Sequence, residues 1–340
     1  MIVEHLIADT FGTHIGKYQG RLQITQNGAV LSQAPILHLR TVHVISNGIS
    51  ISSDVLRTCA EEGIPIFFLS SRGQPYASIY ASGLSGTVLT RRAQLLSYYD
   101  QRGIMFALAI ARGKIANQSI TLKYMAKNRK DAQPEIYELL RDASDAVIVH
   151  QADLNRIRGQ SIDEVREQIM GTEGHAAKVY WEAIRAIVPD GYQWEGREGR
   201  GAQDAVNSLL NYGYGILYSQ IEQCVVLAGL DPYAGFLHAD RPGKPSLVLD
   251  MIEEFRQVAV DRVVFGLVNR GYTVQQDETG RLTEAFRRDY AEKITQNLEN
   301  TVRYEGKRFP LRYVIQMQAR HLAVFLRGER EDYAPYKAQW

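Results

Sequence analysis

The hydrophobic pattern of this chain changes its period near residue 85. Before that point short runs alternate between apolar and polar residues, as in residues 21–33, RLQITQNGAVLSQ. After it, apolar residues recur every three or four positions, as in residues 161–170, SIDEVREQIM. The first pattern is typical of half-buried strands and the second of amphipathic helices. The sequence therefore predicts an α+β protein with a small β-sandwich-like domain, residues 1–82, and a larger all-α domain, residues 86–340.

Turn residues divide the first region into strands. Asn27-Gly28 and Asn47-Gly48 each lie between alternating runs. Because Asn-Gly readily adopts the positive φ angles of a tight hairpin turn, both pairs predict hairpins. One short helix is expected from Ser53 to Gly63, followed by a buried strand in residues 64–70, IPIFFLS, and a turn at residues 72–75, RGQP.

The second region has clear helix boundaries. Ser161 and Glu164 form the pattern of a capping box at the start of one helix. Asp204 can cap a long, mostly apolar segment, residues 204–230, which we expect to run through the core. Residues 283–300 and 312–328 predict two further amphipathic helices.

Composition excludes several classes of protein. The net charge is +1, so any nucleic-acid surface must be local. Cys59 and Cys224 form no zinc-type cluster, and two cysteines in 340 residues fit a reducing, cytoplasmic location. No segment has the 18 or so apolar residues that a membrane span requires, so no membrane association is expected. The GxxxxGK[ST], HExxH and GxSxG motifs are absent.

Asp250, Glu253 and Glu254 lie close together on a helical pattern, shortly after the isolated His238. The like-charge pair Asp250 and Glu254 costs a few tenths of a kcal/mol in an isolated helix, so a solvated acidic face is one interpretation. The other is a divalent cation site, because imidazole beside carboxylates suits Mn²⁺ and similar ions. The residues alone leave both open.

Glu173, in the stretch GTEGHAAKVYWEAI, is a second acidic candidate. Its two flanking glycines place it at the start of another helix. A first-turn glutamate stabilised by the helix dipole is the simpler interpretation, and a functional carboxylate is the alternative.

Basic residues are concentrated between positions 91 and 130, where one acid, Asp100, faces nine cations. Such an excess suits contacts with phosphates, although a solubilising helix face would look the same. The glycine-rich stretch GREGRG contains Arg197 and Arg200, and Lys244 lies between His238 and the acidic helix. The nine cations are Arg91, Arg92, Arg102, Arg112, Lys114, Lys123, Lys127, Arg129 and Lys130.

Several stretches together resemble the universal CRISPR-associated endonuclease and integrase of spacer acquisition. They include RRAQLL, ARGKIANQ, GTEGHAAKVYWEAI, GREGRGAQDAVNSLLNYGYGILYSQI, AGLDPYAGFLHADRPGKPSLVLDMIEEFR and VIQMQARHLAVFLRGE. The resemblance covers nearly the whole chain, and residues 204–256 are its most specific part.

The resemblance implies a site for Mg²⁺ or Mn²⁺ held by Glu173, His238 and Glu253. Asp250 matches a neighbouring acidic position that could hold a second ion, a water molecule or His238, and the resemblance leaves Glu254 as a bystander. Positions matching Asn207 and Tyr214 imply positioning roles near the site. Candidate contacts to DNA are Arg91, Arg92, Lys114, Arg200 and Lys244.

The resemblance further implies an activity and partners. The expected reaction is insertion of short foreign DNA fragments into a CRISPR array, in antiviral defence, by attack of a 3′-hydroxyl on a phosphodiester of double-stranded DNA. The β-rich domain would form a homodimer, and a small ferredoxin-like CRISPR-associated protein would join the complex. A non-catalytic nucleic-acid scaffold and a metal-dependent hydrolase of small phosphoesters are the alternatives.

Overall fold

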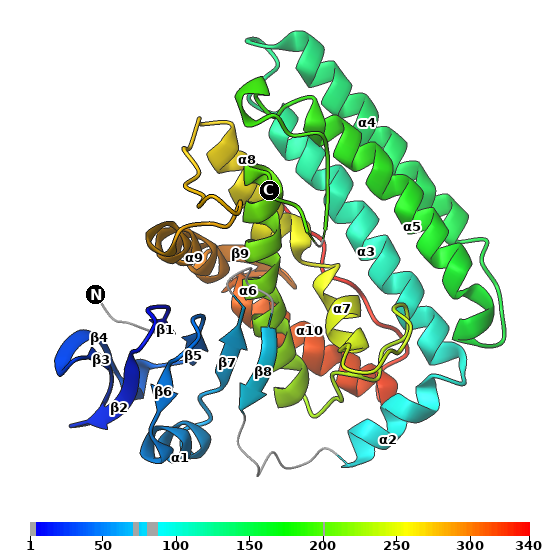
Figure 1. Ribbon diagram of the computed structural model, residues 1–340. Coiled ribbons are helices and arrows are strands. Elements are labelled where there is room, and N and C mark those ends of the chain that lie inside the picture. The colour runs from blue at the N-terminus through cyan, green and yellow to red at the C-terminus, as the bar shows by residue number, and fades with distance from the viewer. Residues whose placement is uncertain (1–4, 71–74, 80–87, 200) are drawn as a thin grey trace.

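The computed structural model describes residues 5–70, 75–79, 88–199 and 201–340 (Figure 1). The predicted turn at residues 72–75 and the boundary near residues 82–86 fall largely outside these ranges. The strand-rich region precedes the helical one, as the change of period predicts. Its strands are β1 (His5–Ala8), β2 (His14–Tyr18), β3 (Arg21–Gln26), β4 (Ala29–Pro35), β5 (Thr41–Val44), β6 (Ser50–Ile51), β7 (Ile66–Leu69) and β8 (Pro75–Ile79).

The strands form two four-stranded sheets, in the orders β1-β5-β7-β8 and β4-β3-β2-β6. In the first sheet β5 pairs in parallel with β1 and β7, with Leu6 opposite Val42. Apolar side chains of both sheets, among them Leu6, Ile15, Leu22 and Val42, share one buried core. Helix α1 (Ser53–Glu61) adds Val55 to it and begins where predicted, because Ser52 Oγ accepts a hydrogen bond from the Val55 N–H.

The Asn-Gly prediction is confirmed at one position and wrong at the other. Asn27 and Gly28 both have positive φ, 49° and 83°, and join β3 to β4 as a hairpin. At the second pair only Gly48 has positive φ, and β5 and β6 belong to different sheets. The chain crosses between the sheets here, and a Cβ at Gly48 would lie 2.6 Å from Phe11. Long-range packing therefore decides this connection.

The helical region contains α2 (Val88–Ser97), α3 (Gln101–Ala126), α4 (Pro134–Leu154), α5 (Ile162–Arg185), α6 (Ala205–Leu227), α7 (Ser246–Ile252), α8 (Arg262–Val268), α9 (Glu284–Glu299) and α10 (Leu311–Leu326). Helices α3, α4 and α5 pack against one another as a layer of long helices beside α6 and α7 (Figure 1). A π-helix (Gln257–Asp261) connects α7 to α8, and the hairpin β9 (Thr301–Tyr304) and β10 (Lys307–Pro310) interrupts the otherwise helical region. Among the described residues, no helix combines the length and apolar character needed to cross a bilayer.

Two local predictions need correction. Ser161 caps α5, but its hydroxyl donates to Glu164 Oε1 at 3.4 Å and accepts no helix N–H, so the capping box is incomplete. Glu173 does not begin a helix: α5 runs unbroken past Gly171 and Gly174 to Arg185. Packing against α3 and α4 stabilises α5 through the two glycines, whose local preference would favour a break.

Helix α6 runs through the core, as its apolar sequence predicts. Asp204 Oδ1 accepts a hydrogen bond from the Asn207 N–H at 2.8 Å and caps its first turn. Gly213 permits close packing here, because an added Cβ would lie 2.6 Å from Val260 of the π-helix. The helix therefore fixes the segment that follows α7.

Candidate active site

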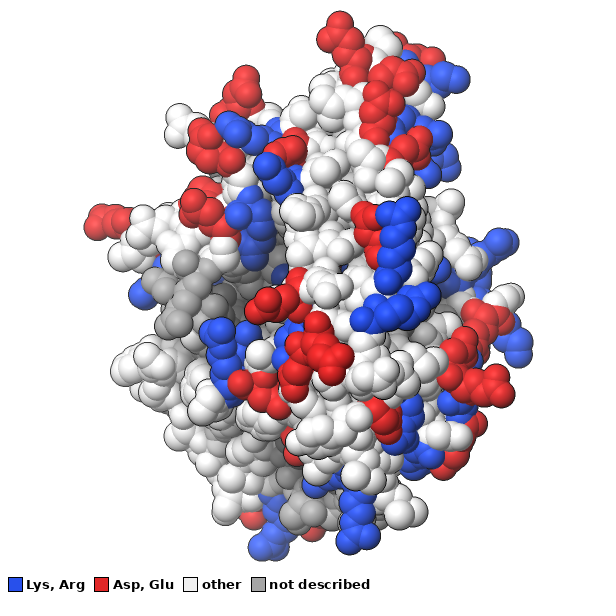
Figure 2. Space-filling view, turned by 90° about the vertical axis from the view of Figure 1, so that its right-hand side faces the viewer, with Lys and Arg blue, Asp and Glu red and all other residues white. Residues whose placement is uncertain are grey.

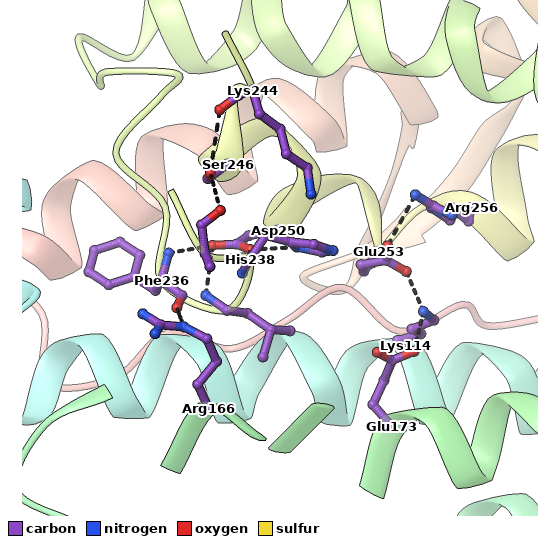
Figure 3. A network of polar contacts seen from close by, with 12 residues as sticks. Lys114, Arg166, Glu173, Phe236, His238, Lys244, Ser246, Asp250, Glu253 and Arg256 are labelled. Carbon is purple, nitrogen blue, oxygen red and sulfur yellow. Dashed lines mark hydrogen bonds and ion pairs between the residues drawn. The ribbon is translucent and has the colours of Figure 1, made fainter. Parts of the chain in front are cut away.

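Three elements that are distant in sequence bring two of the expected carboxylates to one cation. Glu173 extends from the middle of α5, and Glu253 caps the C-terminal end of α7. Between them lies Lys114 of α3, whose Nζ is 2.6 Å from Glu253 Oε2 and forms an ion pair with Glu173 Oε1 as well (Figure 3). All three side chains are at most 15% exposed. The ammonium offsets the repulsion between the two acids.

Glu253 is ionised because cations surround it. Burial alone would raise the pKa of its carboxyl, but Arg256, Lys114 and His238 outweigh burial and lower the pKa to about 2. Arg256 contributes an ion pair of 3.1 Å to Glu253 Oε1. For Lys114, burial disfavours the charged form and lowers the pKa, but the nearby Glu253 and Glu173 raise it by more, so the pKa is raised overall. The site therefore consists of opposite charges in a largely water-excluded space.

His238 lies in the loop between α6 and α7 and is oriented by Asp250. Asp250 is fully buried, and its Oδ1 is 2.8 Å from His238 Nδ1 and accepts the His238 N–H at 2.8 Å. Its Oδ2 accepts the N–H groups of Phe236 and Leu237 at 2.6 and 3.1 Å. Because a carboxylate only accepts, Nδ1 carries a proton, and in the neutral imidazole the lone pair is therefore on Nε2. Asp250 thus contacts His238, which was one of the three possibilities considered for it, and its role in the reaction stays a prediction.

The loop that carries His238 is also tied to neighbouring helices. Arg166 of α5 donates from Nε to the Phe236 carbonyl at 3.1 Å. Ser246, the first residue of α7, donates to the Ala239 and Lys244 carbonyls. Figure 3 shows the imidazole on the Glu253 side of Asp250 and Lys244 above it. The backbone around His238 is therefore held from three directions.

A second buried acid, Asp261, lies behind the site. It accepts hydrogen bonds from the hydroxyls of Tyr214 and Tyr180, the latter at 2.8 Å. Burial raises the pKa of Asp261 to about 6, against the lowering effect of the two tyrosines. The Arg256 guanidinium stacks on the Tyr214 ring, 4.7 Å from its centre. Tyr214 therefore connects Asp261 to the arginine that pairs with Glu253, and the positioning role expected for it stays a prediction.

Asn207 organises the loop before α6. Its Oδ1 accepts from Arg197 and from the Glu198 N–H, and its Nδ2 donates to the Gly196 carbonyl and to Asp204. Arg197 also stacks over Tyr214, 5.4 Å from the ring centre. Arg200, expected in this loop to contact DNA, lies outside the described residues.

The cations between residues 91 and 130 do not form one surface. Arg91 and Arg92 are exposed on α2, whereas Lys114 lies in the site. Arg102 pairs with Asp100, and Arg112 donates to Asn155. On the face that Figure 2 shows, basic and acidic side chains are interspersed. The nine cations therefore include exposed, paired and buried side chains, and three of them, Lys127, Arg129 and Lys130, follow the end of α3.

Glu254 has an unexpected environment. The solvated acidic face considered from the sequence is wrong, because Asp250 and Glu254 are fully buried and Glu253 is 3% exposed. Glu254 points away from Glu253 toward the end of the chain, where it accepts from the Tyr333 hydroxyl, the Tyr336 N–H at 2.7 Å and Gln318 Nε2 at 3.0 Å. Burial raises the pKa of Glu254 to about 7, since all three donors are neutral.

The donor set fits a divalent cation in chemistry. Across the described ranges no three His, Cys, Asp or Glu side chains surround one point, because Lys114 separates Glu173 from Glu253. Both carboxylates nevertheless point at a single positive charge, and the lone pair of His238 Nε2 is left available by the bond at Nδ1. Carboxylate oxygens with one imidazole nitrogen suit Mn²⁺ well, and Mg²⁺ through the oxygens.

Sequence reasoning missed three contributors to this arrangement and considered a fourth, Arg256, only as easing the repulsion within a solvated acidic face. The central place of Lys114 and the pair Asp261 and Tyr180 were not expected. Arg256 had a signal, because it lies three residues after Glu253 on one helical face. The other three depend on contacts between distant parts of the chain and left no local pattern.

The fold and the site define a two-region α+β protein whose helical part directs two carboxylates toward a cation and holds an imidazole near one of them. A family model for CRISPR associated protein Cas1 matches residues 6–296. The chain belongs to this family.

Curated relatives match the chain over nearly its whole length. It is 36% identical to the CRISPR-associated endonuclease Cas1 1 of Archaeoglobus fulgidus, with 98% of this chain and 99% of the relative covered. It is 33% identical to the CRISPR-associated endonuclease Cas1 1 of Francisella tularensis subsp. novicida, with coverage of 99% and 100%.

Solved structures share the fold at lower identity. A casposase bound to integration product has a TM-score of 0.82 and 21% identity, with 99% of this chain and 95% of that chain covered. A CAS1 protein from Thermotoga maritima has a TM-score of 0.78 and 20% identity, with coverage of 99% and 100%. A chain of a Cas6-RT-Cas1–Cas2 complex has a TM-score of 0.78 and 20% identity, with 99% of this chain and 36% of that chain covered.

Proposed function

We propose that this protein is a metal-dependent DNA endonuclease and integrase that inserts short DNA fragments into a CRISPR array. One observation carries the proposal: Glu173 and Glu253, from different helices, converge on one positive charge beside an oriented imidazole. Family membership and the names of the relatives support the same activity.

The residues present would divide the chemistry among them. Glu173, Glu253 and His238 Nε2 would hold Mg²⁺ or Mn²⁺, which when bound supplies Lewis acidity at a phosphodiester. Asp250 keeps the imidazole in the tautomer needed for binding, and Arg256 keeps Glu253 ionised. Lys114, once separated from the carboxylates, presents an ammonium at the position where phosphate charge would increase.

The proposed reaction is a transesterification. The 3′-hydroxyl oxygen of the incoming DNA fragment forms a bond to phosphorus, and the bond to the 3′ oxygen of the target strand breaks. The proton lost by the attacking hydroxyl is balanced by the proton gained by the leaving oxygen. In hydrolysis, water replaces the hydroxyl. Both reactions need in-line alignment and stabilisation of charge on phosphorus, so one site can serve both.

The partners are proposed on the same basis. The β-rich region, residues 1–82, would form a homodimer, and residues 86–340 would be the catalytic domain. Double-stranded DNA and a small ferredoxin-like CRISPR-associated protein would complete the assembly. One solved structure that shares the fold is a Cas6-RT-Cas1–Cas2 complex, which supports a complex of this kind.

The test is strand transfer of a short duplex into a supercoiled plasmid that carries a repeat, with Mn²⁺ present. We expect Glu173→Gln and Glu253→Gln to slow the reaction by roughly 10³-fold, an effect typical of losing a charged catalytic contact. Glu182→Gln is the matched control, because Glu182 lies on α5 with an exposed side chain. Equal rates for all variants would refute the site. DNA binding without any joining or cleavage would instead indicate a scaffold.

A further inference from the structure

A cavity of about 570 Å³ lies away from the carboxylate site, where the C-terminal end of α3 meets α8 and α9. Its charged lining residues are Arg129, Arg262, Arg270 and Lys293. Among the described residues that line it there is no aspartate or glutamate. Four cations around one hollow repel one another. The chain as a whole has a net charge of only +1, so the excess of positive charge in this lining is a local feature. We call this cavity the α8 pocket.

The arginines of the α8 pocket are arranged for an anion. Arg262 stacks between Tyr124 and Trp340, with its guanidinium carbon 5.3 Å from each ring centre. Stacking fixes the plane of a guanidinium and leaves its N–H edge for acceptors. Arg129 Nη1 donates to the Met125 carbonyl, which holds the side chain close to the end of α3.

The other two cations of the α8 pocket, Arg270 and Lys293, differ in whether a carboxylate pairs with them. Arg270 is exposed, and within the described part of the chain no carboxylate forms an ion pair with it or with Arg129 or Arg262. Lys293 differs, because Asp289 pairs with it at 3.2 Å. Three arginines around the hollow therefore have no carboxylate partner among the described residues. The amide side chains of Asn128 and Asn269 also line it, whereas those of Gln296 and Asn300 donate to Glu292 and Asn297.

Planar arginine forks with amide donors are the groups that bind phosphate oxygens. Helix α3 connects the two places, because Lys114 lies near its middle and the α8 pocket lies at its C-terminal end. At about 1.5 Å of rise per residue, roughly 20 Å of helix separates them. Phosphates follow one another about every 3.4 Å along a strand, so one bound duplex could reach both places within roughly six nucleotides.

We propose that the α8 pocket binds a backbone phosphate of the DNA on which the carboxylate site acts. This inference rests on the proposed function for the identity of the anion. The pocket holds the nucleic acid at a second point and leaves the chemistry to Glu173 and Glu253. The pocket therefore increases the affinity of the protein for DNA, and this affinity can be measured under conditions in which no strand transfer or cleavage occurs.

The test measures binding of a fluorescent 30-base-pair duplex by fluorescence anisotropy at a series of salt concentrations. EDTA is present so that no metal-dependent reaction occurs. We expect Arg262→Gln/Arg270→Gln to weaken binding about tenfold and to reduce the slope of log affinity against log salt by about 1–2. Arg156→Gln/Arg185→Gln is the matched control, since both arginines are exposed and ion-paired and the change in net charge is identical. Arg270→Gln alone removes an exposed side chain and tests the pocket without risk to folding.

If the test and control variants lost DNA affinity equally, or if neither lost any, the proposed phosphate contact at the α8 pocket would be wrong. A second arm measures the melting temperature with inorganic phosphate. If phosphate stabilises the wild type but not Arg262→Gln/Arg270→Gln, while DNA affinity is unchanged, the pocket takes free phosphate and the backbone assignment is wrong. Failure of the proposed function is separate, since it would abolish the effect of Glu253→Gln on strand transfer and leave these binding curves unaltered.

Discussion

Glu253 and Glu254 are adjacent in sequence and buried to a similar degree, yet their surroundings are opposite. Glu253 faces α3 and α5 and is paired with Lys114 and Arg256, which lower its pKa to about 2. Glu254 faces the end of the chain and has neutral donors alone, so burial raises its pKa to about 7. The side of α7 that faces α3 and α5 therefore stabilises an ionised carboxylate, whereas the side that faces the C-terminal residues supplies neutral hydrogen-bond donors.

The comparison shows what each carboxylate does for the protein. Glu254 anchors the C-terminal residues against α3, where Asn117 donates to the Glu254 and Tyr336 carbonyls and accepts from the Ala338 N–H. Gly113 makes this approach possible, because an added Cβ would lie 2.7 Å from Pro335. The same α3 turn carries Lys114. Anchoring of the tail and placement of the ammonium therefore share one stretch of backbone.

The largest expected effect on stability is at Glu254. Glu254→Ala should lower the free energy of unfolding by about 3 kcal/mol or more, because it leaves three buried donors without an acceptor. Urea unfolding followed by circular dichroism measures the change.

Glu254→Gln is the control, because its carbonyl can accept from Tyr336 and Gln318 while its amide donates to the Tyr333 hydroxyl. We expect it to cost less than about 1.5 kcal/mol and to retain strand transfer. If Glu254→Gln abolished strand transfer while the fold was intact, the division between the two sides of α7 would be wrong.

Much of the fold could be predicted because its signals are local. The hairpin at Asn27-Gly28, the cap at Asp204 and the long buried α6 follow from residues within one element. The prediction failed at Asn47-Gly48, where the choice between a hairpin and a crossing is made by pairing with distant strands. It failed at Glu173 for a related reason, since tertiary packing stabilises a helix through two glycines.

The candidate site could be predicted in part through family resemblance, which named Glu173, His238 and Glu253; their role as ligands stays a proposal. The acidic pattern alone could not separate Glu253 from Glu254. What separates them comes from Lys114 on one side and Gln318 and Tyr333 on the other, all of them distant in sequence. Periodicity gives the buried face of a helix but not the charge of its neighbours.

The surroundings of Asp261 are intermediate between those of Glu253 and Glu254. Like Glu254 it has neutral donors, Tyr180 and Tyr214, but Arg256 and Arg197 are close enough to lower its pKa in part. The net effect is a pKa raised to about 6, with burial as the main cause. An aspartate in an unfolded chain titrates at about 3.9.

Between about pH 4 and pH 6 the folded protein therefore binds more protons at Asp261 than the unfolded chain. Its contribution to stability is present at low pH and is lost as the pH rises through this window. From about pH 4.5 to pH 8, wild type should lose about 2 kcal/mol more of unfolding free energy than Asp261→Asn. Urea titrations at several pH values measure the difference. Parallel pH profiles would show that Arg256 and Arg197 keep Asp261 ionised, as Glu253 is.

The smallest expected effect concerns the cation that the two acids share. In Lys114→Gln the repulsion between Glu173 and Glu253 loses its internal compensation, and a divalent ion no longer has to displace an ammonium. We expect Mn²⁺ to bind about tenfold more tightly, equivalent to about 1.4 kcal/mol. Isothermal calorimetry at fixed pH gives the dissociation constant. Lys178→Gln, on the exposed side of α5, is the control with the same loss of charge.

Two readouts of Lys114→Gln distinguish its roles. If the ammonium only neutralises the acids, tighter Mn²⁺ binding should come with strand transfer at least as fast as in wild type at limiting metal. If it also contacts phosphate after it leaves the carboxylates, strand transfer at saturating Mn²⁺ should fall although the metal binds better. Mn²⁺ affinity equal to or weaker than that of wild type would contradict both, because it would mean that Glu173 and Glu253 do not hold the ion at the place where they now hold Lys114.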